Sequence, residues 1–205
     1  KAAYSCIEAK EAMGYSCKEA KEAGYTLVEI KAADYTLDEI SDAGYTLTEV
    51  KEAGYTLEEI RAAGIVKGLK AAGFALQEVV AVGFSRSEIE QAGYTLQDAK
   101  AAYSCIEAKE AMGYSCKEAK EAGYTLVEIK AADYTLDEIS DAGYTLTEVK
   151  EAGYTLEEIR AAGIVKGLKA AGFALQEVVA VGFSRSEIEQ AGYTLQDAKA
   201  AYSCI

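Results

Sequence analysis

The sequence predicts an all-α fold, a solenoid or superhelix of short two-turn helices with one helix for each repeat of about ten residues. Three observations support this class. An aromatic residue, or Ile at residues 65 and 164, recurs every 9 to 11 residues, Ser or Thr with Glu three positions later follows it in most repeats, and Gly closes most repeats. Between these markers the apolar residues are spaced by three, which is typical of a helix and not of a strand.

Two periods run through the 205 residues. Residues 1–99 reappear without change as residues 100–198, and residues 199–205 begin a third copy. Each copy holds ten short repeats whose consensus, Tyr-Thr-Leu-x-Glu-Ile-Lys-x-Ala-Gly, is clearest in residues 45–54. We therefore expect one continuous solenoid of identical repeat units, and we interpret the chain as a window cut from a longer tandem array.

Each decapeptide carries the start and stop signals of one helix. Thr46 is a preferred N-cap residue, and Glu49 three residues later can complete a capping box. Gly54 stands where a left-handed residue ends a helix, and Tyr55 follows in the position that packs back on it. Seven of the ten repeats keep Ser or Thr with Glu at this spacing. The clearest boxes predict helix caps at Thr26, Thr36, Thr46, Thr56, Glu29, Glu39, Glu49 and Glu59.

A helix over residues 47–53 would be only about 10 Å long and unstable alone in water. Because Leu47, Val50 and Ala53 form one apolar stripe, we expect consecutive helices to stack stripe on stripe and bury a continuous core. The lysine near the end of each helix, such as Lys51, is expected to interact favourably with the dipole of its own helix. Glu and Lys are expected to cover the outer surface.

Residues 43–51, Ala-Gly-Tyr-Thr-Leu-Thr-Glu-Val-Lys, resemble the repeats of uncharacterised decapeptide short-helix repeat proteins of the AGYTLxEIK type. The resemblance covers all 205 residues. It implies the architecture and brings no activity that could be transferred. The pattern departs from regularity at residues 65–73 and 94–102, where we expect less uniform stacking.

Composition narrows the classes of function. The chain is 50% apolar and 27% charged, which predicts a chain that folds in water without a membrane span. Its net charge of -13 argues against a nucleic-acid partner. The sequence has no His, the commonest general base and a frequent zinc ligand. We expect no enzymatic activity, no cofactor, no bound metal and no small-molecule ligand.

The least regular part of each copy is also its most neutral part. Residues 1–60 carry 13 acidic and 6 basic side chains, whereas residues 61–99 carry 4 of each. Val66 replaces the cap, and Leu69 stands where Glu is expected. This stretch is either a lateral contact between strands or turns of an assembly, or a drifted repeat with a larger local core. The candidate assembly-contact residues are Val66, Leu69, Val79, Val80, Val82 and Phe84.

Cysteines replace the consensus Leu in two neighbouring repeats of each copy, and Cys204 begins the next pair. These cysteines are Cys6, Cys17, Cys105 and Cys116. Each is either a small buried apolar residue or one half of a candidate disulfide, with one bridge per unit. A bridge would suit an extracellular or cell-surface fibre, the location that this hypothesis favours.

Two hypotheses about function follow from the repeats. The first is a structural protein that self-associates, as a homopolymer or laterally, to form or extend a fibre, tube or filament. Such a filament would stretch as its rungs open one after another. The alternative is a polyvalent scaffold that presents the same groove repeatedly to protein partners. Identical copies favour the first hypothesis, because grooves that recognise one particular partner vary between repeats.

Overall fold

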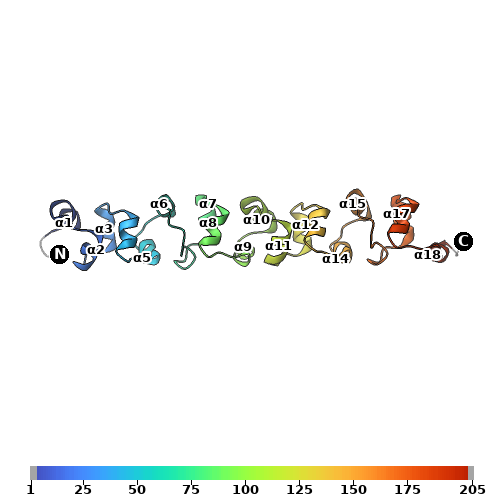
Figure 1. Ribbon diagram of the computed structural model, residues 1–205, viewed down its shortest axis with the longest axis horizontal. Helices are drawn as coiled ribbons and strands as arrows, with labels where there is room; N and C mark the ends of the chain where they lie inside the picture. The colour runs from blue at the N-terminus through green and yellow to red at the C-terminus, as the bar shows by residue number, and fades with distance from the viewer. Residues whose placement is uncertain (1–3, 203–205) are drawn as a thin grey trace. The chain divides into compact units, whose positions relative to one another are not determined.

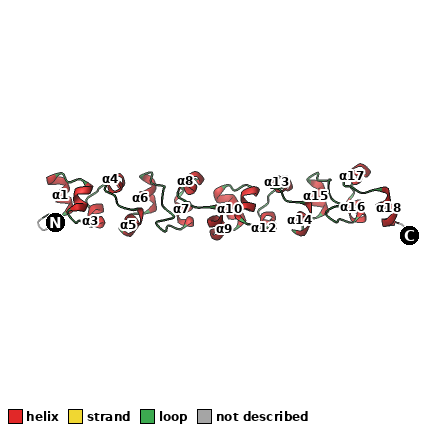
Figure 2. Cartoon of the chain, turned by 60° about the horizontal axis from the view of Figure 1, so that its bottom comes forward, coloured by secondary structure: helices red, strands yellow, loops and turns green. Residues whose placement is uncertain are grey.

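The computed structural model describes residues 4–202, and all of its regular elements in this range are helices (Figure 1). Turns and short loops join them, and no strand occurs among these residues (Figure 2). The prediction of an all-α chain of short helices is therefore confirmed. The chain divides into two compact units, Lys1–Asp98 and Ala99–Ile205, and within each unit the helices follow one another in chain order.

The helices are six to eight residues long, as expected for two turns. Those of the first unit are α1 (Cys6–Met13), α2 (Cys17–Glu22), α3 (Leu27–Ala32), α4 (Leu37–Asp42), α5 (Leu47–Glu52), α6 (Leu57–Ala62), α7 (Leu76–Val82) and α8 (Arg86–Gln91). After α9 (Leu96–Ala102), the second unit contains α10 (Cys105–Met112), α11 (Cys116–Ala122), α12 (Leu126–Ala131), α13 (Leu136–Asp141), α14 (Leu146–Glu151), α15 (Leu156–Ala161), α16 (Leu175–Val181), α17 (Arg185–Gln190) and α18 (Leu195–Tyr202).

Helix α5 shows how the sequence sets both ends of a helix. The Thr46 hydroxyl accepts the backbone N–H of Glu49 at 3.3 Å, and the Glu49 carboxylate accepts the backbone N–H of Thr46 at 2.7 Å. At the other end Gly54 has a φ of 80°, and its N–H donates to the Lys51 carbonyl at 2.9 Å. The next N–H, that of Tyr55, donates to the Val50 carbonyl at 3.3 Å. This Schellman arrangement turns the chain without proline.

Several helices pack on the helix two places further along the chain, and several pack on their immediate neighbour. In the first unit α1 packs on α3 and α2 on α4, and in the second unit α10 packs on α12 and α11 on α13. Consecutive helices also touch, as α1 and α2 do. The expected stacking of consecutive helices is therefore only part of the arrangement. Where helices two places apart are in contact, the packing repeats about every two decapeptides.

The core is a column of apolar side chains supplied once per repeat. Ile30, Ile40 and Ile60 are 0% exposed, and the tyrosine that opens a repeat is buried in most repeats, as Tyr35 is at 4%. Among the described residues no charged or polar side chain belongs to this core. Charge is therefore confined to the surface, and the interior is stabilised by apolar burial.

Residues 65–73, and their copies 164–172, form turns instead of a helix. The prediction of one helix per decapeptide is wrong here, because Val66 offers no cap oxygen and Gly68, with a φ of 89°, interrupts the backbone. Leu69 is 0% exposed, and its carbonyl accepts the N–H of Phe74 at 3.1 Å, as Val50 accepts that of Tyr55 at 3.3 Å.

Leu69 is thus the counterpart of Val50, an apolar core residue, and the shortened repeat has no counterpart of the capping Glu49. By contrast, the other irregular stretch, residues 94–102, contains a helix of ordinary length, α9.

Candidate functional site

The polar side chains of the described chain are organised around the junction between successive helices, and not around a catalytic cluster. No group of three or more His, Cys, Asp or Glu among the described residues could hold a metal ion. We define a junction as the last turn of one helix together with the aromatic residue and capping box that begin the next repeat. A basic residue from two helices earlier reaches into it.

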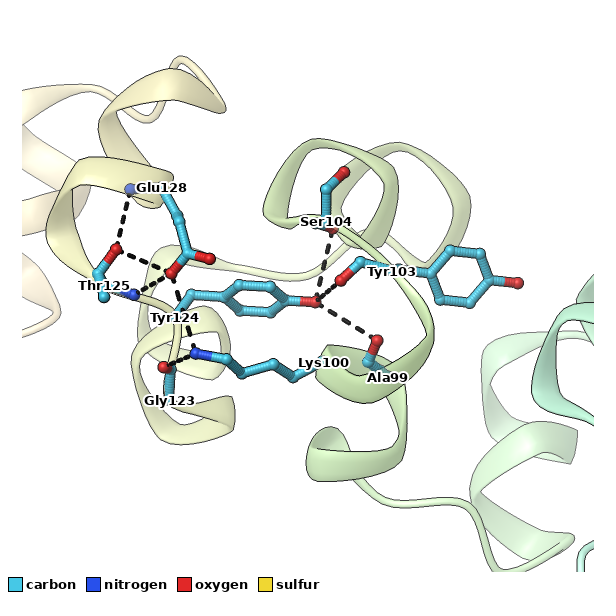
Figure 3. A network of polar contacts seen from close by, with 8 residues as sticks. All are labelled: Ala99, Lys100, Tyr103, Ser104, Gly123, Tyr124, Thr125 and Glu128. Atoms are coloured by element: carbon cyan, nitrogen blue, oxygen red, sulfur yellow. Dashed lines mark hydrogen bonds and ion pairs between the residues drawn. The ribbon is translucent and has the colours of Figure 1, made fainter.

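The junction at Tyr124 shows all of these parts (Figure 3). Lys100, from α9, donates from Nζ to the carbonyl of Gly123, at the end of α11. The same Nζ lies 5.1 Å from the centroid of the Tyr124 ring and 3.8 Å from the Glu128 carboxylate, which caps α12. One ammonium group therefore contacts both the C-terminal end of α11 and the N-terminal end of α12. Its positive charge interacts favourably with the carbonyls exposed at the end of α11.

The tyrosine hydroxyl makes a second hydrogen bond between repeats. We call each helix with its following turn a rung of the solenoid, and a side-chain bond between two rungs a tie. Tyr124 Oη donates to the carbonyl of Tyr103 at 2.9 Å, with the Ala99 and Ser104 carbonyls each at 3.5 Å (Figure 3). Such bonds span 20 or 21 residues, or two decapeptides, at several other positions. They join Tyr25 to Tyr4, Tyr35 to Tyr15, Tyr94 to Phe74, Tyr134 to Tyr114 and Tyr193 to Phe173.

The basic contact recurs along both units, and we call it the basic clamp. In each case the cation donates to a backbone carbonyl 21 to 24 residues later and lies over the aromatic ring of that junction, at 3.8 to 5.8 Å from the centroid. The clamps of the first unit are Lys10, Lys21, Lys31, Lys51 and Arg61. Those of the second unit are Lys100, Lys109, Lys120, Lys130, Lys150 and Arg160.

The pKa shifts of Glu128 and Tyr124 agree with their roles in the junction. Hydrogen bonds from the backbone and side chain of Thr125 hold the pKa of Glu128 below its usual range, and the charge of Lys100 acts in the same direction. Burial raises the pKa of Tyr124 to about 12. At neutral pH the carboxylate is therefore charged, and the tyrosine is a neutral hydrogen-bond donor.

Comparison with known proteins agrees with this repeat geometry. The family described as decapeptide repeat region matches residues 3–67, 102–166 and 134–203. The chain belongs to the decapeptide repeat family. No curated protein and no solved structure matches it.

The decapeptide capping boxes stand where the sequence places them. Thr26, Thr36, Thr46 and Thr56 each accept the backbone N–H of the glutamate three residues later, and Glu29, Glu39, Glu49 and Glu59 each accept the N–H of their cap residue. These boxes are structural, because both groups of each pair are used in closing the start of a helix.

Sequence reasoning missed the basic clamp, since it assigned each lysine to the dipole of its own helix. A signal was nevertheless present. Each clamp residue stands six positions after the aromatic residue that opens its own repeat. The ring that it contacts opens the third repeat after that one. Where Ser41 replaces the basic residue, Ile65 replaces the ring.

The candidate assembly-contact residues divide into two groups. Leu69, Val79 and Phe84 are only 0%, 0% and 5% exposed, so they belong to the core and are not available to another chain. Their side chains continue the apolar stripe of the decapeptide repeats. Val66, Val80 and Val82 are half-buried, and Val179, the second copy of Val80, is 42% exposed.

The cysteines of the decapeptide repeats are buried free thiols at Cys6, Cys17, Cys105 and Cys116, and Cys204 lies outside the described residues. Burial raises the pKa of Cys17 and of Cys116 to about 11, so the unreactive thiol form predominates at neutral pH. Pairing of these cysteines stays a prediction. Mass spectrometry without reductant checks it, because each bridge would lower the mass of the chain by two hydrogens.

An apolar hollow of about 440 Å³ lies beside α17 and α18, lined in part by Ile188, Leu195 and Ala198. The copies of two of these residues, Ile89 and Ala99, are only 6% and 1% exposed. The hollow is therefore a surface that the decapeptide repeat uses for stacking. No helix in the described part of the chain has both the length and the apolar character that crossing a membrane requires.

Proposed function

We propose that this tandem-repeat chain is a structural protein whose identical units form or extend a fibre, tube or filament. The observation that carries the proposal is the number of residues in the sequence that the bonds between rungs span. The tyrosine bonds span about two repeats, and clamp pairs such as Lys31 with Glu59 span 28 residues. Because each rung is completed by nearby rungs of the same sequence, the pattern can be continued without limit.

Elastic extension is part of the same proposal. The stability of such a solenoid is approximately a sum over rungs and their nearest neighbours, so rungs can open and close one at a time. Most hydrogen bonds of the basic clamps are exposed, where water can replace them, whereas several of the tyrosine bonds are buried. We also propose that the chain is not an enzyme, and the absence of His from the sequence supports this view.

Electron microscopy of the purified chain tests the filament. We expect filaments with a spacing commensurate with one 99-residue unit. Val80→Glu with Val179→Glu should leave helicity unchanged and abolish assembly, because both valines retain exposed apolar surface. Ala81→Glu with Ala180→Glu adds the same charge to the exposed face of the same helices and should leave filaments intact. Dispersed wild-type chains at every concentration would contradict the proposal.

One observation favours the alternative, a polyvalent scaffold for protein partners. Ile7 and Val28 lie on the packed helices α1 and α3 and are 44% and 60% exposed. The pair recurs as Ile106 and Val127, which are 44% and 61% exposed. Each unit thus offers the same small apolar patch.

The scaffold predicts dispersed chains that bind a partner through these patches. Val28→Glu with Val127→Glu should release the partner. Thr48→Glu with Thr147→Glu, at the same helical position on α5 and α14, should not. Binding that survives the valine changes would exclude the patches as the contact surface.

A further inference from the structure

We propose that each unit contains one built-in yield point, at residues 65–73 and 164–172, where the solenoid opens before its other rungs do. This inference deepens the elastic function proposed above, yet it concerns a single chain and its test needs no filament. It rests on the loss of the clamp residue, the ring and the capping box at one junction.

The junction after Gly64 lacks all parts of the arrangement described for Tyr124. Ser41 occupies the position of the clamp residue, Ile65 that of the ring, and Val66 that of the cap hydroxyl, while the capping glutamate is missing from the shortened repeat. The second unit repeats these changes at Ser140, Ile164 and Val165. No polar side chain within the described residues ties this junction to the helix two places earlier.

The junctions on either side keep their clamps. Before it, Lys31 Nζ lies 2.8 Å from the Gly54 carbonyl, 2.9 Å from the Glu59 carboxylate and 4.1 Å from the centroid of Tyr55. After it, Lys51 Nζ lies 2.5 Å from the carbonyl of Gly73. The junction after Gly64 therefore lies between two clamped junctions, the second of which holds Gly73, the last residue of the segment.

The start of residues 65–73 is held by apolar packing and by local backbone bonds, whereas Lys70, near the end of the segment, forms an ion pair with Asp98 at 2.6 Å. Leu69 is 0% exposed and Ala72 is 8% exposed, whereas Ile65 and Val66 are only half-buried. The N–H of Ala72 donates to the Gly68 carbonyl at 2.8 Å. Both groups of this bond lie within the segment, so it does not fasten the segment to another rung.

A second observation concerns the repeat just before the yield point. The hydroxyl of Tyr55 is buried and has no hydrogen-bond partner, and the same is true of Tyr154. A buried donor without a partner raises the free energy of the closed state, and this cost disappears when water reaches the group. The repeat of Tyr55, which precedes the yield point, thus carries a penalty that the repeat of Tyr35, bonded to the Tyr15 carbonyl, does not.

Hydrogen exchange followed by mass spectrometry on the full chain tests the proposal. Among the interior repeats, from α2 to α17, we expect the amides of residues 65–73 and 164–172 to exchange fastest, since local opening exposes them. The repair variant combines Ser41→Lys and Ile65→Tyr with the same changes at Ser140 and Ile164. It restores the clamp and the ring, and should slow exchange there about tenfold, as one charged hydrogen bond would.

The matched control is Thr48→Lys with Thr147→Lys, which adds the same charge at exposed positions of α5 and α14. It should leave exchange of residues 65–73 unchanged. The reverse variant, Lys51→Ser with Lys150→Ser, should speed exchange at the next junction. Uniform exchange across the interior repeats, or equal effects of repair and control, would overturn the proposal. A chain that forms no filaments would overturn the proposed function and leave this result unaffected.

Discussion

The clamp lysine shows how much one side chain does in this array. Lys120 donates to the carbonyls of Ala142 at 3.1 Å and Gly143 at 2.8 Å, and its Nζ lies 3.9 Å from the centroid of Tyr144. Carbonyls at the end of a helix have no helical partner of their own. The lysine therefore satisfies acceptors of α13 from α11, two helices earlier.

Replacing this lysine separates the clamp from a general effect of charge. Lys120→Met keeps most of the apolar length and should lower the free energy of unfolding by about 1 to 2 kcal/mol, because charged hydrogen bonds and a cation–π contact are lost. Lys117→Met removes the same charge from the exposed face of the same helix and should change it by less than about 0.5 kcal/mol. Guanidinium denaturation followed by circular dichroism measures both, and equal losses would contradict the clamp.

The capping carboxylates make the array sensitive to acid. Hydrogen bonds from Thr145 hold the pKa of Glu148 below its usual range, and bonds from Ser104 do the same for Glu107. A carboxyl with a lower pKa in the folded chain stabilises the fold above its unfolded pKa of about 4.3, and this stabilisation is lost as the pH falls through the folded value.

We therefore expect the thermal unfolding midpoint to be constant near neutral pH and to fall as the pH drops below about 4.3. Circular dichroism across this range measures it. A midpoint that stays constant under acid conditions would show that the boxes contribute no stability.

At the scale of single helices, the end signals decide where a helix forms. Thr46 caps α5 through its hydroxyl, whereas Ala75 begins α7 without a side-chain acceptor and keeps only the return bond from its N–H to Glu78, at 2.9 Å. Residues 65–73, which have neither a cap hydroxyl nor a capping glutamate, form turns. Because helices this short are unstable alone, losing both signals removes the helix, while losing one does not.

Completing the box of α7 should stabilise the chain. Ala75→Ser with Ala174→Ser supplies the missing acceptor in both units and should raise the free energy of unfolding by about 1 kcal/mol per helix. Ala81→Ser with Ala180→Ser introduces the same side chain inside the same helices, where Ser is a poorer helix former than Ala, and should not stabilise. Thermal unfolding compares the two pairs, and a gain from the second pair would point to a cause other than capping.

For the whole chain, the expected response to a pulling force depends on which junctions have side-chain ties between rungs. Most junctions carry a clamp, a tyrosine bond or both, and the junctions that begin residues 65–73 and 164–172 carry neither. Single-molecule pulling on the chain should therefore show several small ruptures, with the lowest force assigned to these segments. Ser41→Lys with Ser140→Lys should raise that lowest force. One all-or-none rupture of the whole chain would contradict independent opening of the rungs.

Most of the helix positions can be predicted from windows of ten residues. Thr46, Glu49 and Gly54 act on backbone groups within a few positions of themselves, so cap and turn rules locate α5 before any packing is known. The same reasoning went wrong at residues 65–73, since a count from Ile65 put Leu69 in the place of Glu49. Only burial shows that Leu69 continues the core.

The partners of the side chains were beyond such rules. Lys100 meets Gly123 and Tyr124 meets Tyr103 because helices two places apart lie against each other. That pitch depends on how the angles of two successive glycine turns add up in space, a quantity no single decapeptide contains. Local chemistry was therefore enough to define the helices, whereas packing across two repeats decided which residues hold them together and where one junction is left unfastened.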